Sequence, residues 1–240
     1  MITVTAHGRA SVLQIDRPER RNALDTDTCN QLRRGLQDSV QGGALAVVIT
    51  GQGSSFCSGA DLSGVYGDEF LLALRTMLSA ITDAPVPVIA AVNGPAIGAG
   101  TQLAVACDLR VAAPTAVFGV PTSQLGLAAE AFTLRRLALF AGGGAARRMM
   151  LAAQRLDVTE AAACGLVDVE GELDDAMALA QRIATLAPMS VAYSKRVLNT
   201  VAAVDDDWAE AGFQRCWTSA DFAEGQLARK EKRLPIFRGR

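Results

Sequence analysis

The order of hydrophobic and polar residues predicts strands that alternate with helices along most of the chain. Two short alternating runs, ITVTA and SVLQI, are joined by HGR and indicate an N-terminal hairpin. Asp25 or Thr26 can cap a helix that runs to about Val40. The apolar runs ALAVVITG and VPVIAAV indicate buried strands, and DLRVAA and AVFGV indicate shorter ones. Further helices are expected near 68–83, over TQLAVAC, near 130–140 and near 144–153. This alternation predicts an α/β fold with buried parallel strands.

From Leu173 onward the pattern becomes almost entirely helical. Apolar residues recur there at spacings of three or four, as on one helix face, until Pro188 ends the run. These residues are Leu173, Met177, Ala180, Ala184 and Ala187. We therefore expect an α/β core over residues 1–172 and a helical region over residues 173–240. The helical region is too small to be stable alone, so its apolar faces should pack on the core or on a neighbouring subunit.

Composition narrows the class of protein. Half of the 240 residues are hydrophobic, which allows a substantial core in one large domain or a domain with a small appendage. The formal charge of −2, without a basic tract, argues against nucleic acid as a partner. The apolar runs are too short for a membrane span, and the N-terminus does not resemble a secretory signal. The five cysteines are scattered without a CxxC pair, so we expect a cytoplasmic protein with buried thiols and no metal site.

Two glycine-containing turns are the best candidates for chemistry. One lies in NGPAIGAGTQLAVACD (93–108) and the other in FCSGADL (56–62). Neither a GxGxxG fingerprint nor a GKS/GKT loop is present, so nucleotide binding is not indicated. A turn that opens a helix presents free N–H groups, and two such donors facing one point would form an oxyanion hole. The alternative is that both stretches are ordinary connections with glycine for backbone reasons. The only histidine, His7, lies in the N-terminal turn, where a catalytic base is not expected.

Five ordered stretches resemble the crotonase, or enoyl-CoA hydratase/isomerase, superfamily. They are RPERRNAL (17–24), ITGQGSSFCSGADL (49–62), PVPVIAAVNGPAIGAGTQLAVACDLRVA (85–112), FGVPTSQLGLAAEAFTLRRL (118–137) and the final EKRLPIF. The resemblance implies a spiral of ββα repeats and a C-terminal helical trimerisation region, hence a homotrimer or a hexamer of two trimers. It also implies a coenzyme A thioester ligand, a fatty acyl-CoA or an enoyl-CoA, and no permanently bound cofactor.

The resemblance assigns roles to individual residues. The oxyanion-hole donors of the family match the backbone N–H groups of Ala60 and Ala99. The residues that match its coenzyme A groove are Arg17, Arg20, Arg21, Ala23, Ala60, Asp61, Leu62 and Lys232. The first three would supply positive charge, although a solvated surface explains them equally well. Lys232 matches a lysine that reaches the cofactor phosphates, commonly from an adjacent subunit, but Arg229 stands where many relatives have an aromatic residue.

The chain departs from the family at its two acid/base positions. Hydratases of the family use two glutamates that share a water, and these positions hold Gln102 and Thr122 here. An amide has no proton to exchange near neutral pH, and a hydroxyl is too weak an acid to act unaided. The sequence therefore predicts weak or absent hydratase activity.

Glu130 offers an alternative source of protons. Dienoyl-CoA isomerases of the family place a catalytic aspartate at the matching position, although they pair it with an acid where this chain has Thr122. An acidic residue is also favoured there simply because it opens a helix. Three hypotheses stay open: an acyl-CoA-binding protein without turnover, an active hydratase or isomerase that uses Glu130, and an unrelated α/β protein.

Overall fold

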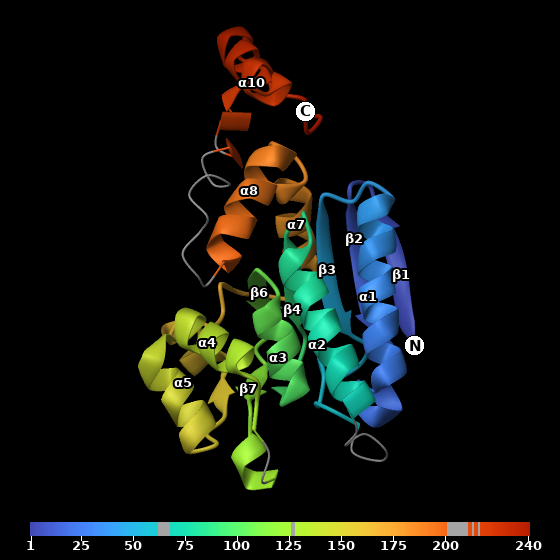
Figure 1. Cartoon of the computed structure of the whole chain (residues 1–240), viewed down its shortest axis with the longest axis vertical. Helices are drawn as coiled ribbons and strands as arrows, with labels where there is room; N and C mark the ends of the chain where they lie inside the picture. The colour runs from blue at the N-terminus through green and yellow to red at the C-terminus, as the bar shows by residue number, and fades with distance from the viewer. Residues whose placement is uncertain (62–67, 126–127, 201–210, 213, 216) are drawn as a thin grey trace.

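A six-stranded sheet forms the centre of the described chain, and all its neighbouring strands except the first two run parallel. The computed structural model describes residues 1–61, 68–125, 128–200, 211–212, 214–215 and 217–240. The strands are β1 (Ile2–His7), β2 (Ala10–Ile15), β3 (Ala46–Gly51), β4 (Val88–Val92), β6 (Leu109–Ala112) and β9 (Val169–Glu170), in the order β1-β2-β3-β4-β6-β9. β1 and β2 pair antiparallel, which confirms the predicted N-terminal hairpin (Figure 1).

A second, smaller sheet contains the short strands β5 (Ala96–Ile97), β7 (Val117–Gly119) and β8 (Leu156–Asp157). Two isolated parallel bridges, Leu24 with Ala60 and Cys57 with Ala96, extend its pairing toward the N-terminal half. Successive crossings of the chain between the two sheets thus bring the segment around Leu24, the FCSGAD turn and β5 side by side.

Each crossing is followed by a helix, so the chain winds as a spiral of strand, strand and helix. The helices are α1 (Thr26–Gln41), α2 (Asp68–Asp83), α3 (Ala99–Ala106) and α4 (Ala131–Phe140). Asp25 caps α1 by accepting a hydrogen bond from Thr28 N, as the sequence predicts. Helices α1, α2 and α3 lie over one face of the large sheet (Figure 1). The predicted α/β class and its ββα winding are both present.

The central strands β3 and β4 are buried on both faces of the large sheet because alternate residues enter two different cores. Val47 and Ile49 of β3 pack with α1 and α2, whereas Ala46 and Val48 pack on the opposite face. The second face is covered by α7 (Leu173–Ile183), whose buried side chains are Ala176, Ala180 and Ile183. The start of the predicted helical region is therefore packed directly on the sheet.

The C-terminal residues are helical, as predicted, but the first helix is shorter than its apolar pattern suggests. α7 ends at Ile183, and α8 (Pro188–Asn199) begins with Pro188 at its first position. The expected single stripe to Ala187 is wrong because the residue before a proline is forced out of helical geometry, and Ala187 is extended. α5 (Gly142–Leu151), α6 (Val158–Ala163) and α10 (Ala220–Glu231) complete the named α-helices.

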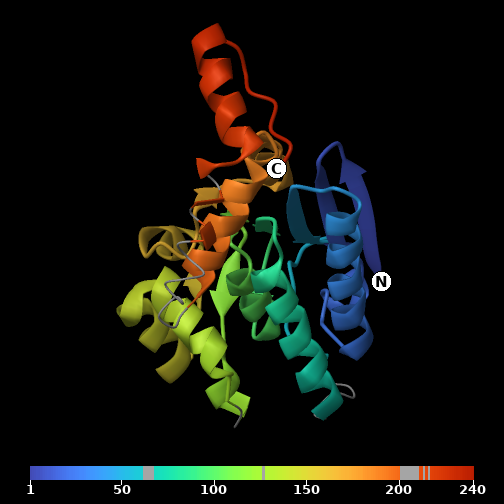
Figure 2. The same cartoon turned by 45° about the horizontal axis from the view of Figure 1, so that its top comes forward.

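α10 extends away from the sheets in both views (Figures 1 and 2). Its contacts include the tail that follows it, because Asp221 accepts hydrogen bonds from Arg238 N and Gly239 N at 2.7 Å. Within the ranges that the structure describes, no helix is long and apolar enough to cross a membrane.

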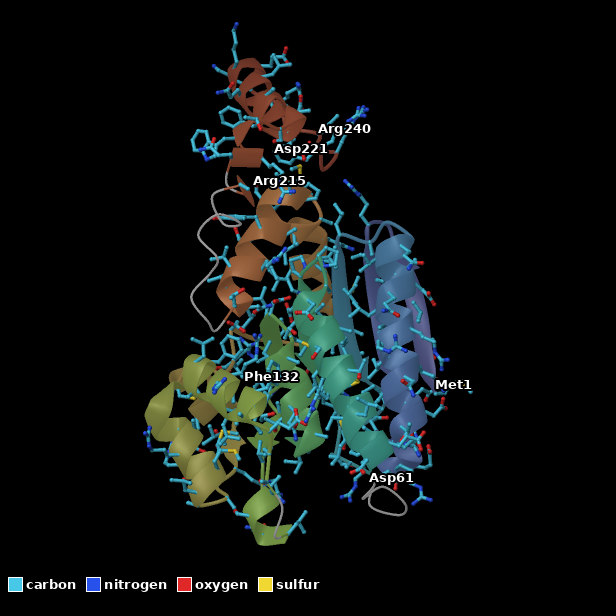
Figure 3. The ribbon with its side chains drawn as sticks, viewed as in Figure 1. Met1, Asp61, Phe132, Arg215, Asp221 and Arg240 are labelled. Atoms are coloured by element: carbon cyan, nitrogen blue, oxygen red, sulfur yellow. The ribbon has the colours of Figure 1, made fainter. Side chains whose placement is uncertain are left out.

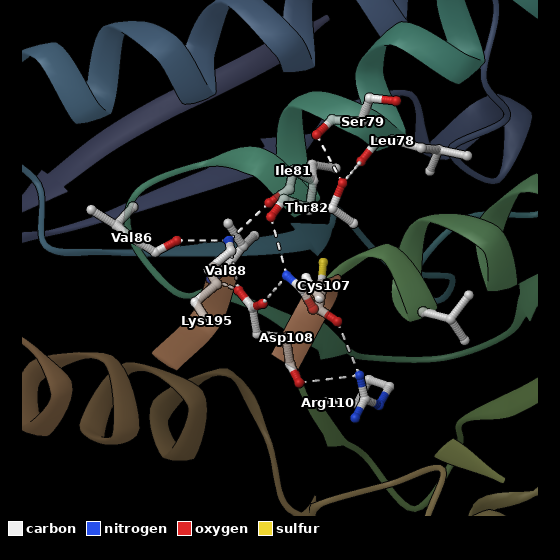
Figure 4. Close-up of polar contacts among 12 residues, drawn as sticks. Leu78, Ser79, Ile81, Thr82, Val86, Val88, Cys107, Asp108, Arg110 and Lys195 are labelled. Atoms are coloured by element: carbon white, nitrogen blue, oxygen red, sulfur yellow. Dashed lines mark hydrogen bonds and ion pairs between the residues drawn. The ribbon is translucent and has the colours of Figure 1, made fainter. Parts of the chain in front are cut away.

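A buried ion pair fastens α8 to the core (Figure 4). Lys195 Nζ lies 2.8 Å from Asp108 Oδ2 and donates to the carbonyl oxygens of Ile81 and Val86. The other oxygen of Asp108 accepts from Asn199 Nδ2 at 3.1 Å. Charged groups are rarely buried without such partners, so α8 is held to the loop after α2 and to the start of β6.

Candidate functional site

The two predicted glycine turns touch each other main chain to main chain. A methyl group on Gly59 would lie 2.9 Å from the carbonyl oxygen of Ile97 and 3.8 Å from the backbone nitrogen of Ala99. A methyl group on Gly100 would overlap the carbonyl oxygen of Cys57. Only glycine fits this contact, since any side chain would push the turns apart. Sequence reasoning identified both turns, and the structure brings them together.

Gly98 gives the second turn its shape. Its φ of 56° lies in the left-handed region that favours glycine, and its N–H donates to the carbonyl oxygen of Gly119 at 2.7 Å. The next residue, Ala99, begins α3, and the first hydrogen bond of that helix runs from Gln102 N to the Gly98 carbonyl. The Ala99 N–H therefore has no partner within the helix.

The Ala60 N–H is left open for a different reason. In the bridge to Leu24, the Leu24 N–H donates to Gly59 and the Leu24 carbonyl accepts from Asp61 N. Because backbone groups alternate in direction along an extended chain, the Ala60 N–H points away from this pairing. In the part of the chain that the structure describes, neither Ala60 N nor Ala99 N donates a hydrogen bond. Two backbone donors thus stand on two turns that are in contact.

Asn22, which sequence reasoning did not single out, holds the neighbouring loop in place. It is fully buried with a φ of 57°, and its Nδ2 donates to the carbonyl oxygens of Gln52 and Ser55. Its Oδ1 accepts from Arg17 N at 3.0 Å. The asparagine in the motif RPERRNAL is a sequence signal for this role, because asparagine adopts a positive φ more readily than most residues.

The three arginines of this loop differ in how much of their charge is free for a ligand. The guanidinium of Arg17 lies 2.9 Å from Asp25 Oδ2 and 3.1 Å from Asp61 Oδ2, so two carboxylates already compensate it. Arg20 and Arg21 are exposed, and neither forms an ion pair within the described residues. Their carbonyl oxygens accept from the hydroxyl and the backbone N–H of Ser58. The two exposed arginines therefore lie beside the turn that carries Ala60.

The remaining residues expected to contact coenzyme A are not all gathered at this point. Ala23 is buried in the Arg17 loop, and its carbonyl oxygen accepts from the Arg17 guanidinium. Leu62 lies outside the described residues. Lys232 follows α10 with a φ of 53°. Figure 3 shows Asp61 near the bottom of the molecule and Asp221, on α10, near the top, so α10 lies far from the turn that ends at Asp61.

Gln102 is buried in α3, one turn beyond Ala99. Its side-chain oxygen accepts a hydrogen bond from the hydroxyl of Thr133 on α4 at 3.1 Å. Thr122, the other position of interest, lies in the short 3-10 helix Thr122–Leu125 after β7 and is half-buried. No hydrogen bond joins Thr122 to Gln102. Thr133, which orients the amide, was not anticipated from the sequence.

Glu130 forms an ion pair with Arg75, which the sequence gave no reason to expect. It precedes α4, and its Oε1 accepts from the guanidinium of Arg75 on α2 at 2.8 and 3.1 Å. The hydrogen bonds strengthen the protonated form of the guanidinium, which raises the pKa of Arg75. The contact between Glu130 and Arg75 thus links the start of α4 to α2.

A thiolate nucleophile is not available at the turns. Burial raises the pKa of the Cys57 thiol to about 12, so it stays protonated at neutral pH. The four described cysteines are all free thiols. Among the described side chains, no group of three or more His, Cys, Asp or Glu residues could hold a metal ion.

Known proteins resemble this chain over its whole length. The model of the family described as enoyl-CoA hydratase/isomerase matches residues 7–240. A probable enoyl-CoA hydratase, echA6, of Mycobacterium tuberculosis is 43% identical over 242 residues, covering 100% of both chains. The short-chain-enoyl-CoA hydratase of Clostridium acetobutylicum is 32% identical, covering 97% of this chain and 95% of its own. The crystal structure of an enoyl-CoA hydratase from Bacillus anthracis superposes with a TM-score of 0.91 at 29% identity, covering 100% and 99%.

The contact between the turns can be tested with a single methyl group. We expect Gly100→Ala to lower the free energy of unfolding by roughly 2–3 kcal/mol, because the added carbon overlaps the Cys57 carbonyl. Gly144→Ala is the matched control, since nothing lies within 4 Å of the added carbon and alanine favours the helix. Urea unfolding would measure both. Equal stability of Gly100→Ala and the wild type would contradict the close approach of the turns.

Proposed function

The chain belongs to the enoyl-CoA hydratase/isomerase family, and on that premise we propose that it binds a fatty acyl-CoA in lipid metabolism with little or no hydratase activity. The backbone N–H groups of Ala60 and Ala99 would hold the thioester oxygen. The proposal rests mainly on Gln102, whose side chain is a neutral amide. This amide accepts a hydrogen bond from Thr133 and lies one helical turn from the Ala99 N–H group.

The two open N–H groups suit a thioester for energetic reasons. Each donor aimed at a developing oxyanion can stabilise it by ~3 kcal/mol in a site that excludes water. The same N–H groups can also donate to the carbonyl oxygen of a ground-state thioester, so they support binding even where no reaction follows. The contact between Gly59 and Ala99 supports a common target for the two donors.

Addition of water needs more than this pair of donors. One acid/base catalyst typically contributes a factor of 10²–10⁴ in rate. Gln102 cannot supply or take a proton near neutral pH, and Thr122 has only a hydroxyl group. Without either catalyst, hydration of an enoyl-CoA should be slowed by several orders of magnitude. The binding function is independent of that loss.

The contact of Glu130 with Arg75 favours this proposal over an isomerase that uses Glu130. To pass a proton along an acyl chain, the carboxyl group must alternate between protonated and ionised forms. Arg75 donates two hydrogen bonds to one oxygen of Glu130, so this oxygen already has a partner within the protein. Each cycle would therefore have to break this contact.

The proposal includes assembly of the protein as a homotrimer or a hexamer. Lys232 directly follows α10, which lies far from Asp61 (Figure 3), so this lysine would approach coenzyme A phosphates on another subunit. The apolar groove beside α8, about 740 Å³ in volume, includes the exposed side chains of Leu139, Leu186 and Leu198. Such a surface suits a subunit interface. Sedimentation equilibrium should give the mass of three or six chains, and a monomer at micromolar concentration would contradict this part of the proposal.

The lost acid/base pair can be restored. We expect the wild type to bind a trans-2-enoyl-CoA in calorimetry without consuming its conjugated absorbance. Gln102→Glu with Thr122→Glu should gain measurable hydration, because each new carboxyl group can contribute 10²-fold or more. Gln102→Met is the control, since it fills similar volume without an acid.

Three results would contradict the proposal or a part of it. Wild-type turnover at the 1–10³ per second of ordinary enzymes, lost on Glu130→Gln, would show an active enzyme that uses Glu130. A failure to bind any acyl-CoA would remove the ligand altogether. A double variant that folds and binds but gains no activity would show that the two positions do not share a water.

A further inference from the structure

We propose that Gln102 makes the site selective for acyl-CoA thioesters that carry a carbonyl oxygen on C3, that is, for 3-oxoacyl-CoA. This inference rests on the proposed binding of an acyl-CoA and adds the chemical class of the acyl group. It begins from a hydrogen-bond donor that has no partner.

The orientation of the Gln102 amide is fixed by α4. The hydroxyl of Thr133 donates to the side-chain oxygen at 3.1 Å, and both residues are buried. The oxygen therefore faces α4, and the Nε2 group faces the other way. Gln102 is only 7% exposed, so its amide is far from bulk water.

The Nε2 group donates to no residue that the structure describes. The fully enclosed side-chain nitrogens and oxygens without a partner are, in the same described ranges, Arg33 Nε and Ser39 Oγ. Gln102 Nε2 is not one of them, so it keeps a small accessible surface within a residue that is otherwise buried. A buried N–H without an acceptor is unfavourable, and a ligand oxygen that reaches it is correspondingly favoured.

The position of this donor matches C3 of a bound acyl group. Gln102 follows Ala99 by three residues on α3, so the two lie on one face of the helix, about 4.5 Å apart along its axis. Side chains on a helix lean toward its N-terminus, which brings the amide back toward the Ala99 N–H. C3 is two bonds from the thioester carbonyl carbon, and its substituent is therefore within reach of a group one turn away.

The chemistry of the amide selects a carbonyl at that carbon. A saturated acyl chain or an enoyl group has no acceptor on C3 and would leave Nε2 unpaired. A hydroxyl group on C3 could accept, but its own proton would need another acceptor because Thr133 already occupies the Gln102 oxygen. A glutamate at this position would present oxygens to the ligand and disfavour the same carbonyl.

Comparison of two ligands tests the proposal without altering the protein. We expect isothermal titration calorimetry to show a 3-oxoacyl-CoA binding about 3- to 10-fold more tightly than the saturated acyl-CoA of equal length. Equal affinity would overturn the proposal while leaving acyl-CoA binding intact. If neither thioester binds, the proposed function fails, and this inference fails with it.

Variants identify the donor. Gln102→Met keeps similar volume without a donor and should remove the preference, so that the two ligands bind with equal affinity. Gln102→Glu should remove or reverse it. A preference that survives both substitutions would show that another group recognises C3, which would overturn the assignment.

Thr133 positions the Gln102 amide, and variants of Thr133 test this role separately. Thr133→Val removes the hydroxyl that holds the Gln102 oxygen, whereas Thr133→Ser retains it. We expect the ratio of the two affinities to fall toward one in the valine variant and to persist in the serine variant. A purely structural role would lower both affinities together and leave their ratio unchanged, contrary to the proposal.

Discussion

The close approach of two turns is the constraint on which the site depends. Gly59 and Gly100 allow the main chain of the first turn to lie against that of the second, and a single methyl group at either position would meet a carbonyl oxygen. The contact leaves the N–H groups of Ala60 and Ala99 open on adjacent segments. The spiral supports it, since the strand before each turn belongs to the same sheet and the helix after it packs on that sheet. A crotonase fold is thus a way of bringing two main-chain donors together.

Much of the scaffold can be predicted from the sequence because each element has its own local signal. The hairpin at the N-terminus, the helix over 68–83 and the buried strand VIAAV all follow from hydrophobic periodicity. The glycine turns are visible for the same reason, since close main-chain contact needs glycine. The predicted division at residue 172 remains a prediction, although α7 packs on the sheet of the preceding region. Crotonase membership is confirmed by the family match and by solved structures of the same fold.

What the sequence does not reveal is how charges are paired over long separations. Arg110 and Arg136 are almost fully buried, and Lys195 meets an aspartate that precedes it by 87 positions. From the sequence alone, such residues are expected at the surface, because buried arginine and lysine are rare without partners. The same limitation applies at the site. Arg17 forms ion pairs with Asp25 and Asp61. No local pattern connects Arg75 to Glu130 or Thr133 to Gln102, since these pairs form only when separate helices pack.

The proposed binding of a thioester oxygen by the backbone N–H groups of Ala60 and Ala99 is tested most directly by removing one of these donors. Ala99 is the first residue of α3, where proline fits a helix and lacks only the N–H. The account predicts that Ala99→Pro binds acyl-CoA at least tenfold more weakly and binds free coenzyme A, which has no thioester carbonyl, unchanged. Ala131→Pro, at the first position of α4, is the matched control and should bind both as the wild type does. Unchanged acyl-CoA affinity in a folded Ala99→Pro variant would contradict the account.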